Sequence, residues 1–173
     1  MASQTLLVAQ SIERSREIPL TAFAPNTSYA VCFTPGQDCE GLIVSEINHA
    51  SKSILIQAYS FTSTPIAKAL VQAKQRGVDV RAILDKSQRS ERYTGATYLL
   101  HAGIPLGIDE KPAIAHSKVF IFDQGTVLTG SFNFTRAAQT KNAENLIVIK
   151  GDQNLVKLYT GNWVTRWGVS VPM

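Results

Sequence analysis

From residue 29 onward, two hydrophobic periods alternate along the chain. Short runs of β-branched and aromatic residues predict strands, and apolar residues spaced three or four apart predict helices between them. The expected strands cover 29–33, 53–59, 78–84, 104–108, 117–122, 126–129 and 146–150. The expected helices cover 38–50, 64–77, 91–101 and a last segment after residue 152. This order predicts an α/β fold, a layered sandwich with a mixed, largely buried β-sheet flanked by helices on both faces.

Two helix starts carry capping signals. Thr64 is the expected N-cap of the second helix because Pro65 follows it at the first helical position. Asp152 is the expected cap of the last helix. The expected inner face of that helix is apolar and consists of Leu155, Leu158, Tyr159 and Trp163.

Residues 1–28 share no pattern with the rest of the chain. The apolar run 6–9 and the small-residue sequence 22–24 resemble parts of a signal peptide, but charged residues between 13 and 17 interrupt the apolar region. This segment is therefore an N-terminal extension or a remodelled signal region. Residues 29–173 are expected to form a single domain.

Composition excludes several classes of protein. A hydrophobic content of 45% with 17% charged residues is not that of a disordered chain. No apolar run approaches the roughly 18 residues of a membrane span. Cys32 and Cys39 bracket a turn, so a disulfide and a pair of reduced thiols both remain open.

The net charge of +4 is concentrated in one part of the sequence. Residues 66–92 hold the whole excess of basic over acidic side chains, and the remainder of the chain is balanced. Lysine and arginine side chains of this kind contact the phosphates of nucleic acids. Aromatic side chains that could stack on bases are Tyr59, Phe61, Tyr93 and Tyr98.

His116 and Lys118 are the first candidates for chemistry. Residues two apart on a strand share a face, so these side chains point the same way while Val119 and Ile121 pack on the other face. An imidazole can attack a phosphate ester or transfer a proton, and the ammonium neutralises the non-bridging oxygens. The pair therefore predicts phosphoester chemistry.

Polar residues after Gly130 complete this candidate site. Gly130 permits close backbone approach, and Ser131 and Asn133 can donate hydrogen bonds to the same phosphate oxygens. A nucleophilic histidine needs an acceptor for the N–H on its other nitrogen, and Glu144 is the best-placed carboxylate.

The spacing His-x-Lys-x4-Asp-x6-Gly-Ser-x-Asn resembles the HKD motif of the phospholipase D superfamily. The chain is most similar to short bacterial endonucleases of that superfamily, which carry one motif per chain. The likeness runs from about residue 29 to 167 and includes segments 57–62, 76–80, 102–105, 130–135 and 142–145.

The resemblance implies roles for the motif residues. His116 becomes the nucleophile, Lys118 and Asn133 become phosphate ligands with Ser131 in support, and Glu144 orients His116. Asp123 belongs to the motif, but it lies at a turn and receives a structural role. The family also favours a periplasmic or secreted protein, whereas the lack of a clean signal peptide leaves the cytoplasm open.

The chemistry of the family uses two histidines, and this chain has one motif. His49 and His101 lie at predicted helix ends without the x-Lys spacing, so a homodimer with a shared site is expected. No cluster has metal-ligand spacing, which predicts no metal and no cofactor.

DNA is the expected partner and substrate, with RNA as an open alternative. A phospholipase D acting on lipid headgroups and a non-catalytic nucleic-acid-binding module are the rival hypotheses.

Overall fold

The computed structural model describes residues 18–89 and 95–173. The prediction about residues 1–28 lies for the most part outside this range, as does the predicted start of the helix over 91–101. Among the described residues, no helix combines the length and the apolar character needed to cross a membrane.

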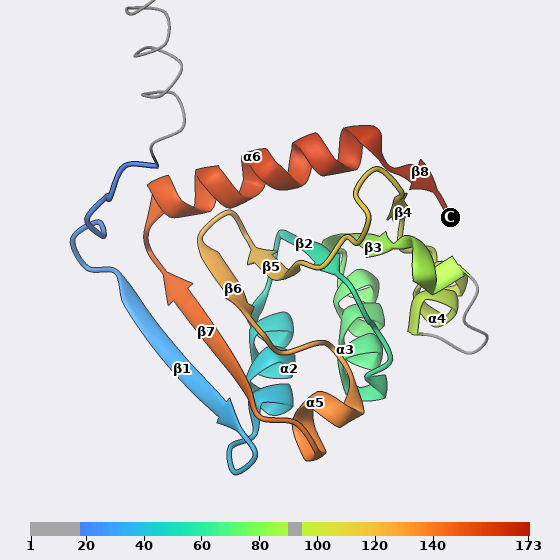
Figure 1. Ribbon diagram of the computed structural model, residues 1–173, viewed down its shortest axis with the longest axis horizontal. Coiled ribbons are helices and arrows are strands. Elements are labelled where there is room, and N and C mark those ends of the chain that lie inside the picture. The colour runs from blue at the N-terminus through green and yellow to red at the C-terminus, as the bar shows by residue number, and fades with distance from the viewer. Residues whose placement is uncertain (1–17, 90–94) are drawn as a thin grey trace, which may run out of the picture.

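One mixed sheet organises the described part of the chain. Its eight strands lie in the order β1-β7-β6-β5-β2-β3-β4-β8 (Figure 1). Strands β2, β3 and β4 are parallel, and the other neighbours pair antiparallel. The strand bounds are β1 Ser28–Thr34, β2 Ser53–Ala58, β3 Asp79–Asp85, β4 Leu106–Asp109, β5 Lys118–Phe122, β6 Thr126–Gly130, β7 Glu144–Lys150 and β8 Val171–Pro172.

Helices cover both faces of this sheet. Their bounds are α2 Cys39–His49, α3 Thr64–Gln75, α4 Gly95–His101, α5 Arg136–Thr140 and α6 Gln153–Val169, with a 3₁₀ turn at Lys86–Arg89. Helices α2 and α3 lie on one side of the sheet, and α6 runs across the other side (Figure 1). The predicted α/β sandwich with a mixed, helix-flanked sheet is confirmed.

Strand β5 shows how alternation builds the two layers of the core. Phe120 and Phe122 belong to the large apolar cluster that includes α2 and α3. Val119 and Ile121 belong to the smaller cluster that includes Trp163 of α6. Since successive side chains of a strand point to opposite faces, one strand contributes to both layers. The expected packing of Val119 and Ile121 is confirmed.

Two details of the helices differ from the prediction. Ser63, not Thr64, is the N-cap of α3, because its Oγ accepts a hydrogen bond from the Ile66 N–H, and Pro65 therefore occupies the second helical position. Leu158 is 71% exposed, and Val156 packs inward in its place. A helix turns about 100° per residue, so Leu158 lies on nearly the opposite side from Val156.

The two cysteines form a disulfide that joins β1 to the first residue of α2. The Cα atoms of Cys32 and Cys39 are 5.6 Å apart. Both side chains are buried. The structure therefore selects the disulfide from the two alternatives that the sequence leaves open.

Candidate active site

Lys118 begins β5 and His116 lies two residues before it, and the antiparallel pairing places Lys118 opposite Ala58 at the carboxyl end of β2. Nζ of Lys118 is 3.0 Å from Nδ1 of His116 and donates to the His116 carbonyl oxygen at 2.7 Å. The two side chains lie side by side as predicted. Their contact makes them a single polar unit.

Tyr59, the residue after β2, packs against both members of this pair. Its ring centroid is 4.5 Å from that of His116 and 5.2 Å from the Lys118 ammonium. A cation over an aromatic face is attracted by the ring quadrupole. Tyr59 therefore restrains both groups and leaves the exposed imidazole facing solvent.

Lys118 is only 6% exposed. This burial lowers the pKa of the Lys118 ammonium, and the negative charge of Glu144 partly opposes the shift. The lysine is thus held where a phosphate could replace the hydration that burial has removed.

The contact with Lys118 also bears on the imidazole tautomer. An ammonium can only donate, so Nδ1 of His116 is the acceptor and the neutral ring carries its proton on Nε2. Attack by Nε2 requires the proton on Nδ1 instead. A phosphate that takes the hydrogen bonds of Lys118 would release Nδ1 and permit this exchange.

Ser131, Glu144 and Asn145 come together where β6 ends beside the start of β7. Ser131 Oγ donates to Glu144 Oε2 at 2.6 Å and accepts from the Asn145 backbone N–H at 3.0 Å. This approach requires Gly130, since a Cβ there would lie 2.3 Å from the Asn145 carbonyl oxygen. Asn142 Nδ2 donates to the second oxygen of Glu144 at 3.0 Å. The predicted Gly-Ser segment and Glu144 therefore form one network.

Asn133 lies between two fully buried phenylalanines, Phe132 and Phe134. Its Oδ1 is buried and has no hydrogen-bond partner among the residues that the structure describes. Buried amide oxygens are normally paired. This side chain therefore retains hydrogen-bonding capacity, as a ligand-contacting residue requires.

Glu144 does not reach His116 within one chain. Among the described residues no hydrogen bond joins the two side chains, and the Glu144 carboxylate is bonded to Ser131 and Asn142 instead. The geometry of one subunit thus leaves the expected orientation of His116 by Glu144 without a direct contact.

Asp123 lies at the opposite edge of the sheet. Its carboxylate accepts from the backbone N–H groups of Ser51, Lys52 and Ser53 at 2.7–2.9 Å. Burial alone would raise the pKa of Asp123, but these bonds outweigh it and the pKa lies below its ordinary value. With φ of 51° at the tip of the β5–β6 hairpin, Asp123 has the contacts of a structural residue.

Asp85 holds the backbone next to His116 and has no role in the sequence-based prediction. It ends β3, is 3% exposed, and its Oδ2 accepts from the Ala115 N–H at 2.7 Å. Its other oxygen accepts from the Ser87 N–H. The sequence feature that could have identified Asp85 is an acidic residue at the end of an apolar strand, because a carboxylate buried there requires hydrogen-bond partners.

The basic segment 66–92 is divided between two edges of the sheet. Lys68 in the first turns of α3, with Lys86 and Arg89 after β3, lies toward the edge that carries His116. Lys86 donates to the Pro112 carbonyl oxygen, and Arg89 pairs with Glu110. Both contacts hold the loop before His116.

The remaining basic residues of that segment lie elsewhere. Arg76 donates to the Ile47 carbonyl oxygen, and Arg81 pairs with Asp79 at the start of β3, away from the His116 edge. Lys74 is in the last turn of α3, and Arg92 lies outside the described residues. Only part of the basic segment therefore lies on the side of the sheet that carries His116, because the chain crosses the molecule and returns within it.

The candidate aromatics also separate. Phe61 is fully buried and packs edge-on against Phe134, so it cannot stack on a base. Tyr98 is 47% exposed, and Tyr93 lies outside the described residues. Tyr59 is the aromatic in contact with His116.

The other two histidines lie in the last turns of their helices, His49 in α2 and His101 in α4. Nδ1 of His49 pairs with the Ser45 carbonyl oxygen at 2.7 Å. Over 18–89 and 95–173, the structure forms no group of three or more histidine, cysteine, aspartate or glutamate side chains that could hold a metal ion.

Comparison with known proteins identifies the family. Residues 43–167 match the family model described as cardiolipin synthase, PLD-like domain. Phospholipase D of Rickettsia felis is 44% identical over 137 residues, which cover 79% of this chain and 68% of that protein. The mitochondrial cardiolipin hydrolase of Xenopus laevis is 29% identical over 154 residues, 87% of this chain and 73% of that protein.

A solved structure agrees with these matches. Nuc from Salmonella typhimurium, a phospholipase D family member, superposes with a TM-score of 0.82 at 42% sequence identity. The superposition covers 86% of this chain and 99% of that one. The chain therefore belongs to the phospholipase D superfamily and is a hydrolytic phosphodiesterase.

Proposed function

We propose that the protein is a metal-independent endonuclease that hydrolyses DNA with little sequence specificity, RNA being a second substrate to test. The reaction proceeds through a phosphohistidine at a site shared by two subunits. The observation that carries this proposal is the His116–Lys118 pair, an exposed imidazole beside a buried ammonium. Ser131 and Asn133 on the neighbouring loop supply neutral hydrogen bonds.

In the first step, Nε2 of His116 attacks phosphorus and forms a P–N bond. The bond from phosphorus to the leaving alcohol oxygen breaks, and an imidazolium protonates that oxygen. Lys118 and Asn133 bind the non-bridging oxygens as negative charge increases on them. In the second step, water attacks phosphorus, the second imidazole takes the water proton, and the P–N bond breaks to release a phosphomonoester.

The second imidazole comes from His116 of another copy of the chain. His49 and His101 lie in the last turns of α2 and α4, not beside the His116–Lys118 pair. A two-fold axis that passes beside His116 supplies the missing acid without any further residue. The dimer is thus a requirement of the chemistry that we propose.

Glu144 receives a role across this axis in the proposed mechanism. Within one subunit it is bonded to Ser131 and Asn142 and not to His116. We assign it to the Nδ1–H of His116 in the other subunit, where it would hold the tautomer that leaves Nε2 free to attack.

Polar and cationic groups near the site favour a nucleic-acid backbone as the substrate. Arg136 of α5, with Thr62, Thr64 and Thr140, lines a cavity of about 360 Å³, to which Glu40 adds one carboxylate. Arg136 and Lys141 are both exposed. Guanidinium and hydroxyl groups are common ligands of neighbouring phosphates in a nucleic acid.

A phospholipid phosphodiesterase is the second candidate. The names of the Rickettsia and Xenopus relatives refer to lipid substrates, and the same residues could act on a lipid headgroup. The experiment that separates the two assays supercoiled plasmid, single-stranded DNA, RNA and phosphatidylcholine vesicles in parallel with EDTA present.

We expect plasmid cleavage in EDTA, and we expect His116→Ala to abolish it while DNA binding persists. Unchanged turnover by His116→Ala would remove the catalytic assignment. Loss of activity in EDTA that a divalent ion restores would contradict metal independence.

A further inference from the structure

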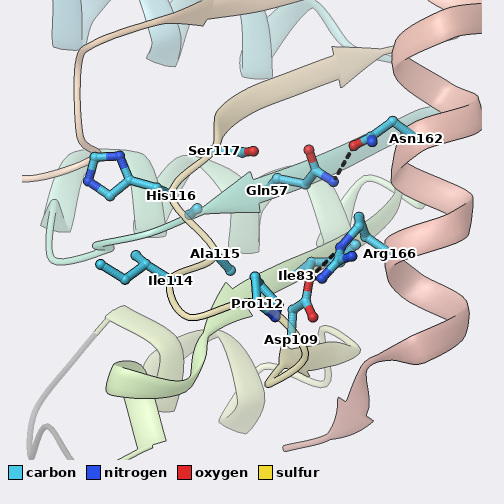
Figure 2. A pocket seen from close by; sticks show the side chains of 11 residues that line it. Gln57, Ile83, Asp109, Pro112, Ile114, Ala115, His116, Ser117, Asn162 and Arg166 are labelled. Atoms are coloured by element: carbon cyan, nitrogen blue, oxygen red, sulfur yellow. Dashed lines mark hydrogen bonds and ion pairs between the residues drawn. The ribbon is translucent and has the colours of Figure 1, made fainter. Parts of the chain in front are cut away.

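A cavity of about 200 Å³ opens beside His116, between the loop that precedes β5 and helix α6. The labelled side chains come from β2, β3, the end of β4, this loop and α6, with His116 at one side (Figure 2). The proposed phosphate ligands Lys118, Ser131 and Asn133 do not line it. It therefore adjoins the reacting phosphate without being part of the phosphate site.

One wall of this cavity is apolar. Pro112 and Ile114 line it from the loop, and Ile83 lines it from β3. Ile114 is 54% exposed, so an apolar surface next to the reacting centre faces solvent. Cavities that combine such a wall with a few placed polar groups are typical of small-molecule sites.

The side of the cavity toward α6 presents an amide pair. Gln57 Nε2 donates to Asn162 Oδ1 at 3.1 Å (Figure 2). In the described part of the chain, this bond leaves the Gln57 carbonyl oxygen and the Asn162 NH₂ group with no other partner. The Gln57 carbonyl oxygen is an acceptor and the Asn162 NH₂ group is a donor, and a nucleobase edge carries donors and acceptors that can pair with such groups.

The far end of the cavity carries balanced charge. Arg166 Nε donates to Asp109 Oδ2 at 2.6 Å, and the two side chains form an ion pair. Because each charge is compensated by the other, this end favours neither a cationic headgroup nor a second phosphate. An acyl chain is also disfavoured, since the cavity ends on charged side chains.

We propose that the cavity binds the nucleoside attached to the scissile phosphate, with the base between the Ile114 wall and the Gln57–Asn162 pair. This inference rests on the proposed nuclease function and names a part of its substrate. Every base has a donor and an acceptor on its edges, so each base can pair with an acceptor on Gln57 or a donor on Asn162. The low sequence specificity of the proposed function follows from the same geometry.

The test compares two phosphodiesters with the same leaving group. Thymidine 5′-(4-nitrophenyl phosphate) carries a nucleoside, and bis(4-nitrophenyl) phosphate does not. The measurement is the ratio of their kcat/KM values for wild type, Asn162→Leu and Asn162→Trp. We expect the kcat/KM of the thymidine ester, relative to that of bis(4-nitrophenyl) phosphate, to fall about tenfold in both variants. Asn162→Leu removes one or two hydrogen bonds, and Asn162→Trp fills the cavity.

A matched control is available on the same helix. Asn154 is also an exposed asparagine of α6, two turns earlier, and it does not line the cavity. Asn154→Leu and Asn154→Trp are expected to keep the wild-type ratio, and thermal melting confirms that all four variants fold.

Two results would overturn the inference in distinguishable ways. An unchanged ratio in the Asn162 variants, with both esters still hydrolysed, removes the nucleoside site and leaves the proposed function intact. Cleavage of phosphatidylcholine vesicles by a wild type that cleaves neither nucleic acid nor the thymidine ester removes both.

Discussion

Nδ1 of His116 lies 3.0 Å from the ammonium of Lys118, so the proposed nucleophile and the proposed phosphate ligand are hydrogen-bonded to each other before substrate binds. A bound phosphate must break this hydrogen bond before each side chain can perform its proposed role. When Lys118 turns to a phosphate oxygen, the imidazole loses a donor and can exchange its tautomer.

Lys118→Gln tests this coupling. We expect kcat on bis(4-nitrophenyl) phosphate to fall about 10²- to 10³-fold, because the variant removes a fixed positive charge beside the reacting phosphate. The nitrogen chemical shifts of His116 should change as well, since Nδ1 loses its donor. Lys111→Gln, an exposed lysine in the loop before His116, is the control. Wild-type kcat in Lys118→Gln would contradict the assignment.

The alkaline limb of the pH–rate profile should report Lys118. Burial disfavours the ammonium, so the pKa of Lys118 lies below the ordinary value of 10.5. As the pH rises, activity should therefore begin to decline before pH 10.5 is reached. Glu144 favours the charged form, so Glu144→Gln lowers the pKa further and moves the limb to lower pH. Profiles of kcat/KM for both proteins provide the measurement. A limb that moves to higher pH would show that Glu144 acts otherwise.

Asp85 is expected to position His116 through the Ala115 N–H. Asp85→Asn keeps one acceptor oxygen for two N–H groups, and we expect kcat to fall about tenfold with little change in KM. Asp79→Asn, at the exposed start of the same strand, is the matched control. Equal losses in both variants would assign the effect to the strand and not to His116.

The same carboxylate predicts an acid limit to stability. Burial raises the pKa of Asp85, but the Ser87 and Ala115 N–H bonds outweigh it, so the pKa lies below the ordinary value of 3.8. A group with a depressed pKa stabilises the fold above its unfolded value and loses that contribution as the pH falls through the folded value. Urea unfolding of wild type between pH 5 and pH 3 should therefore show a loss that Asp85→Asn largely lacks.

Asp123→Ala separates a structural residue from a catalytic one. The change leaves three backbone N–H groups of residues 51–53 without their acceptor and should lower the free energy of unfolding by about 1–2 kcal/mol. Activity per folded molecule should remain at the wild-type level, because Asp123 lies at the edge away from His116. A large loss of kcat without a loss of stability would place Asp123 in the site.

Mixing subunits tests the shared site. If each site needs His116 from both chains, every mixed dimer of wild type and His116→Ala is inactive. After subunit exchange with a fivefold excess of the variant, the activity of the wild-type subunits should fall to about one sixth. Activity that stays constant at all mixing ratios would show that one chain is sufficient.

Local sequence predicts those parts of the site in which the alternation of side chains along a strand sets which residues are neighbours. Lys118 begins β5 and His116 precedes it by two residues, and the alternation expected of a strand predicts that the two side chains lie side by side. The order of apolar segments likewise predicts the helix-flanked sheet. The N-cap of α3 lies one residue before its predicted position. On α6, Tyr159 and Trp163 pack inward as predicted, whereas Val156 and not Leu158 does so, because two residues along a helix change the direction of a side chain by about 200°.

Contacts across strands depended on the tertiary structure. Glu144 meets Ser131 only because β6 and β7 are neighbours, and Asp85 meets Ala115 only because β3 ends beside the loop before β5. The basic segment 66–92 is one block in the sequence, yet it spans the sheet from one edge to the other. A count along the sequence adds charges that the fold separates. The sequence determined which residues can perform the chemistry, and the order of strands in the sheet decided which of them are in contact.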